Sequence, residues 1–325
     1  MESQILNICQ VSLVRDISLI EKNYLNFSKF YNKFHLYIIC PQKDLILFKE
    51  KFKNHNITIV NEDDILSFKD FKNIFLNLSK AIKYQKEFEN RLGWYYQQML
   101  KITFVIDFID NKKESIVIWD ADTIILRKIN FFRNFNSNSF ASLFEFHKAY
   151  YITTKNILGI LPSYFVSSLI QFIAVDIENN FNLKNKLNNY MEKDLFQTSE
   201  WVSNIIFKSI FESHAEYNGS MFSEYELIGI SNLLLRKRKQ KALFTLRFGL
   251  NGMLTDGQIL ICKLLNVYHV TYEHSHPNKN SQGMLNRNQS WLKFLKIIIK
   301  SLFKYSLRNI KHNINYYVIN RNKEI

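Results

Sequence analysis

The chain has 325 residues, and its 43 Lys and Arg against 29 Asp and Glu give a formal net charge of +14. A hydrophobic content of 47%, with 15% aromatic residues, excludes an intrinsically disordered chain and is enough for a large core. The three cysteines, Cys9, Cys40 and Cys262, are widely spaced and form no CxxC pair. They predict neither a disulfide framework nor a cysteine zinc site, and they favour a reducing compartment.

The sequence predicts no membrane-spanning helix, because it contains no uninterrupted apolar run of about 18 residues. The N-terminal residues lack a basic segment ahead of a long apolar stretch, so no signal peptide is expected.

Most of the positive charge lies in two stretches. Residues 287–325 contain nine basic residues and one acid, Glu324, and five further basic residues lie between Arg236 and Lys241 without an acid among them. The two stretches hold 13 of the 14 net charges. The rest of the chain is nearly neutral, which disfavours a uniformly basic nucleic-acid-binding protein.

The first sixty residues alternate between strand-like apolar runs and segments with helical spacing. The predicted elements are a strand over Ile5–Val14, a helix over Ile17–Phe30, a strand over Phe34–Cys40, a helix over Asp44–Phe52 and a strand over Ile57–Val60. This order predicts a parallel α/β sheet, which binds ligands at the carboxyl ends of its strands. Neither GxGxxG nor a P-loop motif occurs, so no dinucleotide fingerprint and no P-loop is present.

Two helices are expected next, over Leu66–Phe88 and from about Trp94 to Ile106. At 100° per residue, one face of the second helix is apolar, with Tyr95, Met99, Ile102 and Ile106. Another stripe is formed by Trp94, Gln97, Gln98 and Lys101. The helix pattern alone favours water, rather than a ligand, against this polar stripe.

Two carboxylates follow a buried-strand pattern. Ser115–Trp119 runs directly into Asp120-Ala-Asp122. Such a pair forms a compact oxygen site that suits Mg²⁺ or Mn²⁺, which keep open positions for phosphate oxygens. The alternatives are an exposed acidic turn and a phosphatase of the haloacid dehalogenase type. The phosphatase motif requires Thr or Val at the fifth position, where this chain has Ile124.

These segments resemble an uncharacterised bacterial family of GT-A-like glycosyltransferases associated with cell-surface polysaccharide synthesis. The resemblance rests on Arg91-Leu-Gly-Trp94, Gln97-Gln98, Lys101, the Asp120–Thr123 segment and Phe222-Ser-Glu-Tyr-Glu-Leu-Ile-Gly229, and it covers about residues 5–229. Ile228 stands where that family would have an aromatic residue. The resemblance implies a GT-A fold, which is Rossmann-like with a mostly parallel mixed sheet flanked by helices. It also implies a nucleotide-sugar donor and a divalent metal, Mn²⁺ or Mg²⁺, at Asp120 and Asp122.

The Ser223–Glu226 segment has the spacing of a capping box at a helix start. That spacing assigns Glu226 a structural role and leaves Glu224 as the freer carboxylate. Glu224 is therefore the candidate general base for the acceptor hydroxyl, with Glu226 as the alternative. The alternative is that Glu224 is not a base and serves only to offset the dipole of the helix.

Further candidate site residues lie near strand ends. The resemblance to GT-A enzymes implies that Arg15 and Asp16, after the first strand, meet the donor nucleotide, and Gln98, Lys101 and Arg91 are assigned to the donor with them. The strand-like run Val267–Tyr272 precedes His274 and His276, of which His276 is preferred as a third metal ligand, whereas His269 within it is expected to pack. Glu145 with His147 is a possible acceptor-site pair.

The segment Ser290–Lys311 forms an amphipathic helix on a wheel. Its basic residues fall within an arc of about 120°: Lys293, Lys296, Lys300, Lys304, Arg308 and Lys311. Apolar and aromatic residues fill most of the remainder, as in helices that lie in the plane of an anionic membrane surface. Docking of this helix on the domain and binding of a protein partner are the alternatives.

Together these features predict one GT-A domain over residues 1–286, followed by a basic amphipathic helix and tail over residues 287–325. The predicted protein is a metal-dependent glycosyltransferase that transfers a sugar from a nucleotide-sugar donor to a glycan or lipid-linked acceptor. It is expected in the cytoplasm, peripheral on the inner face of the cytoplasmic membrane. The alternative functions are nucleic-acid binding and a catalytically inactive GT-A-like assembly partner.

Overall fold

The computed structural model describes most of the chain. The described residues are 5–79, 85–134, 136–138, 140–143, 147–159, 166–167, 171–194, 196–213, 220–236, 241–249, 253–273 and 290–303. No helix within these ranges has the length and apolar character needed to cross a bilayer.

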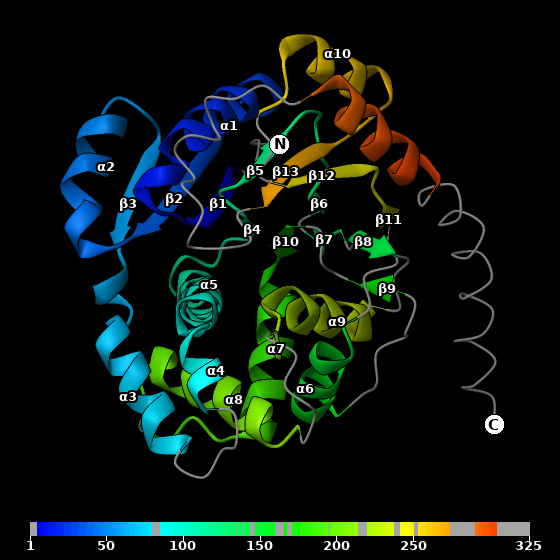
Figure 1. Ribbon diagram of the computed structural model, residues 1–325. Helices are drawn as coiled ribbons and strands as arrows, with labels where there is room; N and C mark the ends of the chain where they lie inside the picture. Colours follow the sequence, from blue (N-terminus) through cyan, green and yellow to red (C-terminus); the bar gives the residue numbers. More distant parts are fainter. Residues whose placement is uncertain are drawn as a thin grey trace.

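The centre of the molecule is a five-stranded sheet in the order β10-β4-β1-β2-β3 (Figure 1). Its strands are β1 (Leu6–Val11), β2 (Phe34–Cys40), β3 (Ile57–Asn61), β4 (Ile116–Trp119) and β10 (Phe172–Val175). The first four run parallel, and β10 pairs antiparallel with β4. The predicted α/β architecture, with a mostly parallel mixed sheet flanked by helices, is therefore confirmed.

Helices cover both faces of this sheet (Figure 1). Among the described residues, the α-helices labelled in Figure 1 are α1 (Ile17–Phe30), α2 (Leu45–Phe52), α3 (Phe68–Leu78), α4 (Gln85–Glu89), α5 (Leu92–Lys112), α6 (Lys148–Leu158), α7 (Ile177–Tyr190), α8 (Thr198–Phe211), α9 (Glu224–Arg236) and α10 (Asp256–Leu264). Successive residues of a strand point to opposite faces. Ile118 of β4 therefore enters the core beneath α5 and α8, whereas Trp119 enters the core on the α1 and α2 side.

The elements expected in the first sixty residues are all present. The helix Ile17–Phe30 and the strand Phe34–Cys40 have the predicted bounds, because each is a short run with one clear period. The segment predicted as one helix over Leu66–Phe88 contains α3 and α4, and residues 80–84 between them lie outside the described part. Helix α5 runs beyond the predicted Ile106 to Lys112, and Lys113 at its C-cap adopts a left-handed conformation.

A second, smaller sheet lies beside the first, in the order β12-β13-β5. Its strands are β12 (Thr245–Gly249), β13 (His269–Glu273) and β5 (Thr123–Ile125). This sheet, α10 and a helix over residues 291–303, which we call the C-terminal helix, enclose a third apolar core. The remaining described strands are the short β6 (Phe132–Arg133), β7 (Asn136–Ser137), β8 (Phe140–Leu143), β9 (Val166–Ser167) and β11 (Lys241–Ala242).

All three cysteines are free and buried. Burial is the main cause that raises the pKa of each thiol to about 12. They therefore act as small apolar core residues rather than as nucleophiles.

Asn23 of α1 joins this helix to β5. Its side chain donates to the carbonyl oxygen of Thr123 (2.7 Å) and accepts from the N–H of Ile125 (3.1 Å), and both bonds are buried. Removing them leaves two buried backbone groups without these partners, which costs about 2–4 kcal/mol. We expect Asn23→Ala to lower the free energy of unfolding by that amount in urea titrations. Ser28→Ala, on the exposed side of the same helix, is the control and should change it by less than about 0.5 kcal/mol. Equal stability of the two variants would contradict this role of Asn23.

Candidate active site

The acidic pair lies where the chain passes from the first sheet to the second. β4 ends at Trp119, and β5 begins at Thr123, so Asp120 and Asp122 occupy the turn between them. The N–H of Asp120 donates to Gln171 at the start of β10 (2.9 Å). On the other side, the carbonyl oxygen of Asp122 accepts from Tyr272 of β13 (2.9 Å). Backbone bonds to both sheets therefore hold the turn.

Side-chain hydrogen bonds also stabilise this turn. The indole N–H of Trp119 donates to the carbonyl oxygen of Thr123 (2.7 Å), the oxygen that Asn23 also contacts. The hydroxyl of Thr123 pairs with that of Thr271 on β13 (2.8 Å). The position of the two carboxylates is thus set by groups from α1, β4 and β13, and it needs no ligand to define it.

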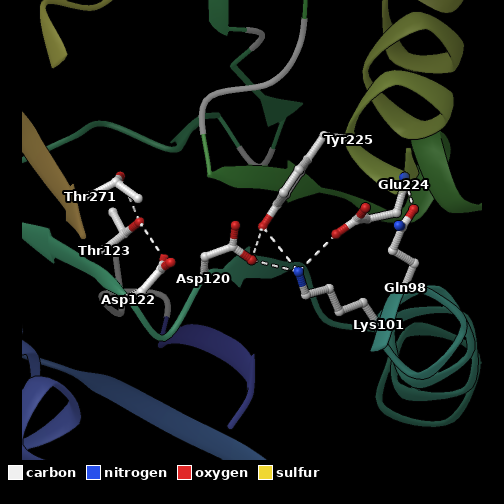
Figure 2. Close-up of polar contacts among 8 residues, drawn as sticks. All are labelled: Gln98, Lys101, Asp120, Asp122, Thr123, Glu224, Tyr225 and Thr271. Atoms are coloured by element: carbon white, nitrogen blue, oxygen red, sulfur yellow. Dashed lines mark hydrogen bonds and ion pairs between the residues drawn. The ribbon is translucent and has the colours of Figure 1, made fainter. Parts of the chain in front are cut away.

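A buried lysine contacts the first of the two acids (Figure 2). The ammonium group of Lys101, on α5, donates to Oδ1 of Asp120 (2.5 Å) and to Oε1 of Glu224 (2.8 Å). The hydroxyl of Tyr225 donates to the same Oδ1 of Asp120 (2.6 Å). Lys101 is 3% exposed and Glu224 is 4% exposed, so this network is shielded from water. Both contacts to Asp120 fall on one oxygen, and the Asp120 side chain keeps 21% of its surface exposed.

The charges of this cluster follow from their surroundings. Burial lowers the pKa of Lys101, but the attraction of Asp120 and Glu224 outweighs it and holds the pKa above its ordinary value. Burial raises the pKa of Glu224, and Lys101 opposes that rise. Burial and the neighbouring carboxylates raise the pKa of Tyr225 well above its usual value. Lys101 is therefore a permanent cation, and Tyr225 a neutral hydrogen-bond donor.

The polar stripe of α5 does not face water, contrary to the helix pattern. Gln98 and Lys101 are buried, because α5 lies between the first sheet and the helices α8 and α9. Gln98 accepts the backbone N–H of Glu224 (3.1 Å). The amide therefore satisfies one of the donors that a helix N-terminus leaves unpaired. The apolar stripe of this helix is buried as predicted.

The start of α9 shows the predicted cap. The hydroxyl of Ser223 accepts the N–H of Glu226 (3.4 Å), and Glu226 is buried. Glu224, which the spacing indicated as the freer of the two carboxylates, is buried as well and is paired with Lys101. Tyr225 lies between these two acids in the sequence, and the capping-box spacing predicts no role for it. No periodic pattern in the sequence identifies its contact with Asp120.

Of the remaining donor-site candidates, Arg15 and Asp16 lie at a strand end next to the acidic pair, and Arg91 lies away from it. Arg15 and Asp16 follow β1, which pairs with β4, so they lie on the strand end next to that of the acidic pair. There Asp16 accepts the N–H of Leu13 (2.9 Å). Arg91 precedes α5, and its guanidinium lies 5.0 Å from the ring centre of Trp94. Ten residues separate it from Lys101, about 15 Å along the helix, so it does not join the cluster.

The structure describes only some of the histidine candidates. His274, His276 and Glu145 lie outside the described residues. His147 caps α6, and its ring lies 4.7 Å from that of Tyr150. His269 is fully buried against Trp119, and burial is the main cause that lowers its pKa to about 3. It therefore packs as a neutral ring, as expected.

The described residues contain no group of three His, Cys, Asp or Glu side chains that could enclose a metal ion. Two carboxylates nevertheless match the way in which Mg²⁺ is bound in nucleotide sites. There one or two carboxylates suffice, and waters and phosphate oxygens complete the coordination. The acidic pair fits such an ion, because both side chains retain exposed surface.

Residues 12–317 match the model of a family of unknown function, DUF6492. The chain belongs to this family. No curated protein matches it.

Among solved structures, one similar to this chain is the galactosyltransferase LgtC in complex with donor and acceptor sugar analogues. It is 9% identical, with a TM-score of 0.42 over 90% of this chain and 95% of that one. Mouse xyloside xylosyltransferase 1 is 8% identical, with a TM-score of 0.35 over 85% of this chain and 100% of that one. The PaToxG glycosyltransferase is 10% identical, with a TM-score of 0.31 over 72% of this chain and 80% of that one.

Replacing Lys101 tests the cluster. Lys101→Met leaves the Glu224 carboxylate buried without its counter-charge, so we expect a loss of about 3–5 kcal/mol in the free energy of unfolding near neutral pH. The folded-state pKa of Glu224 is raised, and it rises further without the ammonium group. A raised carboxyl pKa contributes stability at low pH that is lost as the pH rises through it. The loss should therefore be smaller at about pH 5 than at about pH 8.

Lys208→Met is the matched control, because the Lys208 side chain is 42% exposed and its ammonium group lies 3.9 Å from Glu212 and 5.0 Å from the ring centre of Tyr190. It should cost less than about 1 kcal/mol at either pH. The double variant Lys101→Met with Glu224→Leu should recover part of the lost stability. Equal stability of the Lys101 and Lys208 variants would contradict a structural role for the cluster.

Proposed function

We propose that this protein is a metal-dependent glycosyltransferase that moves a sugar from a nucleotide-sugar donor to a glycan or lipid-linked acceptor. The observation that carries the proposal is the acidic pair Asp120 and Asp122 at the carboxyl end of β4. The strand order reverses beside β4, since β2 and β3 lie on one side of β1 and β4 lies on the other. In open α/β sheets, ligands bind outside the carboxyl ends of the strands at such a change of strand order.

Asp120 and Asp122 are the proposed ligands of Mn²⁺ or Mg²⁺. Such an ion, when bound, neutralises the negative charge that develops on the departing nucleoside diphosphate. Lys101 and Tyr225 act as positioning residues, because both bind the same oxygen of Asp120 and leave its other oxygen for the ion. His276 or His274 remains the proposed third ligand.

Arg15 and Asp16, after β1, are proposed to contact the nucleotide of the donor. Their place on the strand end next to β4 supports this assignment. The contacts of Gln98 and Lys101 favour an indirect role, since Gln98 binds the start of α9 and Lys101 binds two carboxylates. Arg91 retains only the resemblance as support, because its distance along α5 separates it from the acidic pair.

Glu224 is the proposed general base that takes the proton of the acceptor hydroxyl. Burial raises the pKa of its carboxyl group, and a raised pKa strengthens a carboxylate as a base near neutral pH. Lys101, which donates to Oε1 of Glu224, opposes this rise. Glu226 is the alternative base.

The resemblance to enzymes of bacterial surface polysaccharide synthesis suggests a capsule or lipopolysaccharide acceptor. We place the protein in the cytoplasm, peripheral on the inner face of the cytoplasmic membrane. The basic row of the C-terminal helix supports this location. Lys293, Lys296 and Lys300 are exposed there, and Lys304, Arg308 and Lys311 lie outside the described residues.

Replacing Asp122 tests the metal and donor site. We expect Asp122→Asn to reduce nucleotide-sugar hydrolysis or transfer by at least about 100-fold, which corresponds to about 3 kcal/mol of lost stabilisation. A thermal-shift screen of nucleoside diphosphates and their sugars with Mn²⁺ should show binding to the wild type and not to the variant. The control is Asp63→Asn, which changes an exposed acid in the short 3₁₀ helix Glu62–Asp64 and should leave both measurements unchanged.

Full turnover by Asp122→Asn with metal present would contradict the proposal. If no nucleoside diphosphate binds the wild type with Mn²⁺, the result would favour the catalytically inactive assembly partner. Steeply salt-dependent gel shifts with nucleic acid, without nucleotide binding, would support the nucleic-acid alternative instead.

Replacing Glu224 tests the base. Glu224→Gln keeps a hydrogen-bond acceptor for Lys101 but removes the basic oxygen. We expect kcat to fall about 10²–10⁴-fold with little change in the KM of the donor. The acidic limb of the pH–rate profile should also disappear. Glu226→Gln is the matched variant, and a larger loss of kcat in this variant would assign the base to Glu226.

A further inference from the structure

The C-terminal helix contacts the domain through only part of its apolar surface. Phe294 and Ile298 are buried in the third core. The ring of Phe294 stacks on Phe248 of β12, with centroids 6.1 Å apart. Docking on the domain, one of the alternatives for this segment, is therefore present for residues 291–303. Ile297 and Leu302 pack partly against the same core. The docked stripe covers less than half of the circumference of the helix, so docking leaves the apolar residues on the opposite side exposed.

A second apolar stripe of this helix points away from the domain. It consists of Leu292, Leu295, Ile299 and Phe303, of which Ile299 is 66% and Phe303 68% exposed. At 100° per residue, these four residues span about 80°, and Lys296 and Lys300 follow directly on the next part of the wheel. The helix therefore has three stripes: one docked, one apolar and exposed, and one basic and exposed.

Helix α10 extends the exposed apolar stripe. Leu260 is 58% exposed and Leu264 is 73% exposed. They lie three and seven residues after Gly257, on the same side of α10. A side chain at Gly257 would lie 3.7 Å from the ring of Trp291, the first residue of the C-terminal helix. The two helices are neighbours in Figure 1, where α10 is gold and the C-terminal helix orange. We call Leu260, Leu264, Leu292, Leu295, Ile299 and Phe303 the two-helix surface.

The charge beside this surface is positive. Lys263 of α10 and Lys296 and Lys300 of the C-terminal helix are exposed, against one exposed acid at the start of α10, Asp256. Residues 287–303 contain no Asp or Glu. A second copy of the chain would bring these lysines close to one another, and nucleic acid would leave the aliphatic side chains in water. An anionic bilayer matches both features, because it offers phosphates to the lysines and an acyl region to the leucines.

We propose that the two-helix surface binds the surface of an anionic lipid bilayer, with α10 and the C-terminal helix lying along it. This inference deepens the proposed membrane location, on which it rests, by adding α10 and the aliphatic stripe to the basic row. Phe248 connects the surface to β12, β12 pairs with β13, and β13 pairs with β5, which begins directly after Asp122. The acidic pair is thus held at a constant distance from the bilayer, which suits an acceptor that a lipid carries.

The test is co-sedimentation of the full chain with vesicles, without any sugar donor, so that its outcome does not depend on catalysis. Vesicles of phosphatidylcholine and phosphatidylglycerol in equal parts are compared with vesicles of phosphatidylcholine alone. We expect binding to the anionic vesicles and at least tenfold weaker binding to the neutral ones. Leu260→Ser with Leu264→Ser should weaken anionic binding about tenfold, and so should Leu295→Ser with Ile299→Ser. Lys296→Gln with Lys300→Gln should weaken it to a similar extent.

The matched control is Ile46→Ser with Phe181→Ser, two comparably exposed apolar residues on α2 and α7, which should leave binding unchanged. Thermal unfolding checks that each variant folds. Wild-type binding by the Leu260 and Leu264 variant would overturn the two-helix surface, and so would equal binding to neutral vesicles. Concentration-dependent dimers without vesicle binding would assign the surface to a second copy. Asp122→Asn should bind vesicles like the wild type, so loss of catalysis and loss of membrane binding are separable.

Discussion

The buried ammonium group of Lys101 is the interaction on which the candidate site depends. An isolated charge in the interior costs several kcal/mol, and only well-placed partners offset that cost. Here the partners are one carboxylate at the end of β4 and one at the start of α9, so the ion pairs tie both elements to α5. Because Lys101 requires two acids, Asp120 and Glu224 are brought to one place. Lys101 and Tyr225 both bind Oδ1 of Asp120, so only the other oxygen of this carboxylate is left without these hydrogen bonds.

Hydrogen bonds from uncharged groups fix the position of the acidic pair. Its turn lies between two sheets, and each sheet supplies a backbone hydrogen bond to it. Trp119, Asn23 and Thr271 converge on Thr123 from separate elements. Hydrogen bonds of this kind cost little to form and much to leave unmade when they are buried. A turn built in this way keeps two negative groups close together before any cation arrives, which is the preorganisation that binding of a metal–diphosphate requires.

Docking of the C-terminal helix buries only part of the apolar face that the helix wheel predicts. On a wheel, its aliphatic and aromatic residues form one broad face opposite the lysines. The third core takes up Phe294 and Ile298, and Ile297 and Leu302 pack partly against it. The other apolar residues of that face remain exposed beside the basic residues. The exposed leucines of α10 enlarge this apolar surface. A helix that docks on its own domain and presents an apolar and basic outer face can hold that domain at a surface.

Local patterns were sufficient to predict the α/β class, most elements of the first sixty residues and the acidic pair at the end of a buried strand. These features depend on periods of two and 3.6 residues and on the residue types at strand ends, which a single sequence displays. The pattern failed for the polar stripe of α5, since a helix with polar residues on one side can face either water or a buried ion pair. It also could not reveal that Glu224 is buried or that Tyr225 contacts Asp120.

Those contacts join residues that are far apart in the sequence, 123 positions for Lys101 and Glu224 and 105 for Tyr225 and Asp120. They exist only because α5 and α9 pack against the same sheet. The amino-acid sequence by itself thus determined which chemical groups are available and on which element each lies. The tertiary structure decided which of them meet, because burial and distant packing determine whether a charged side chain faces solvent or a partner.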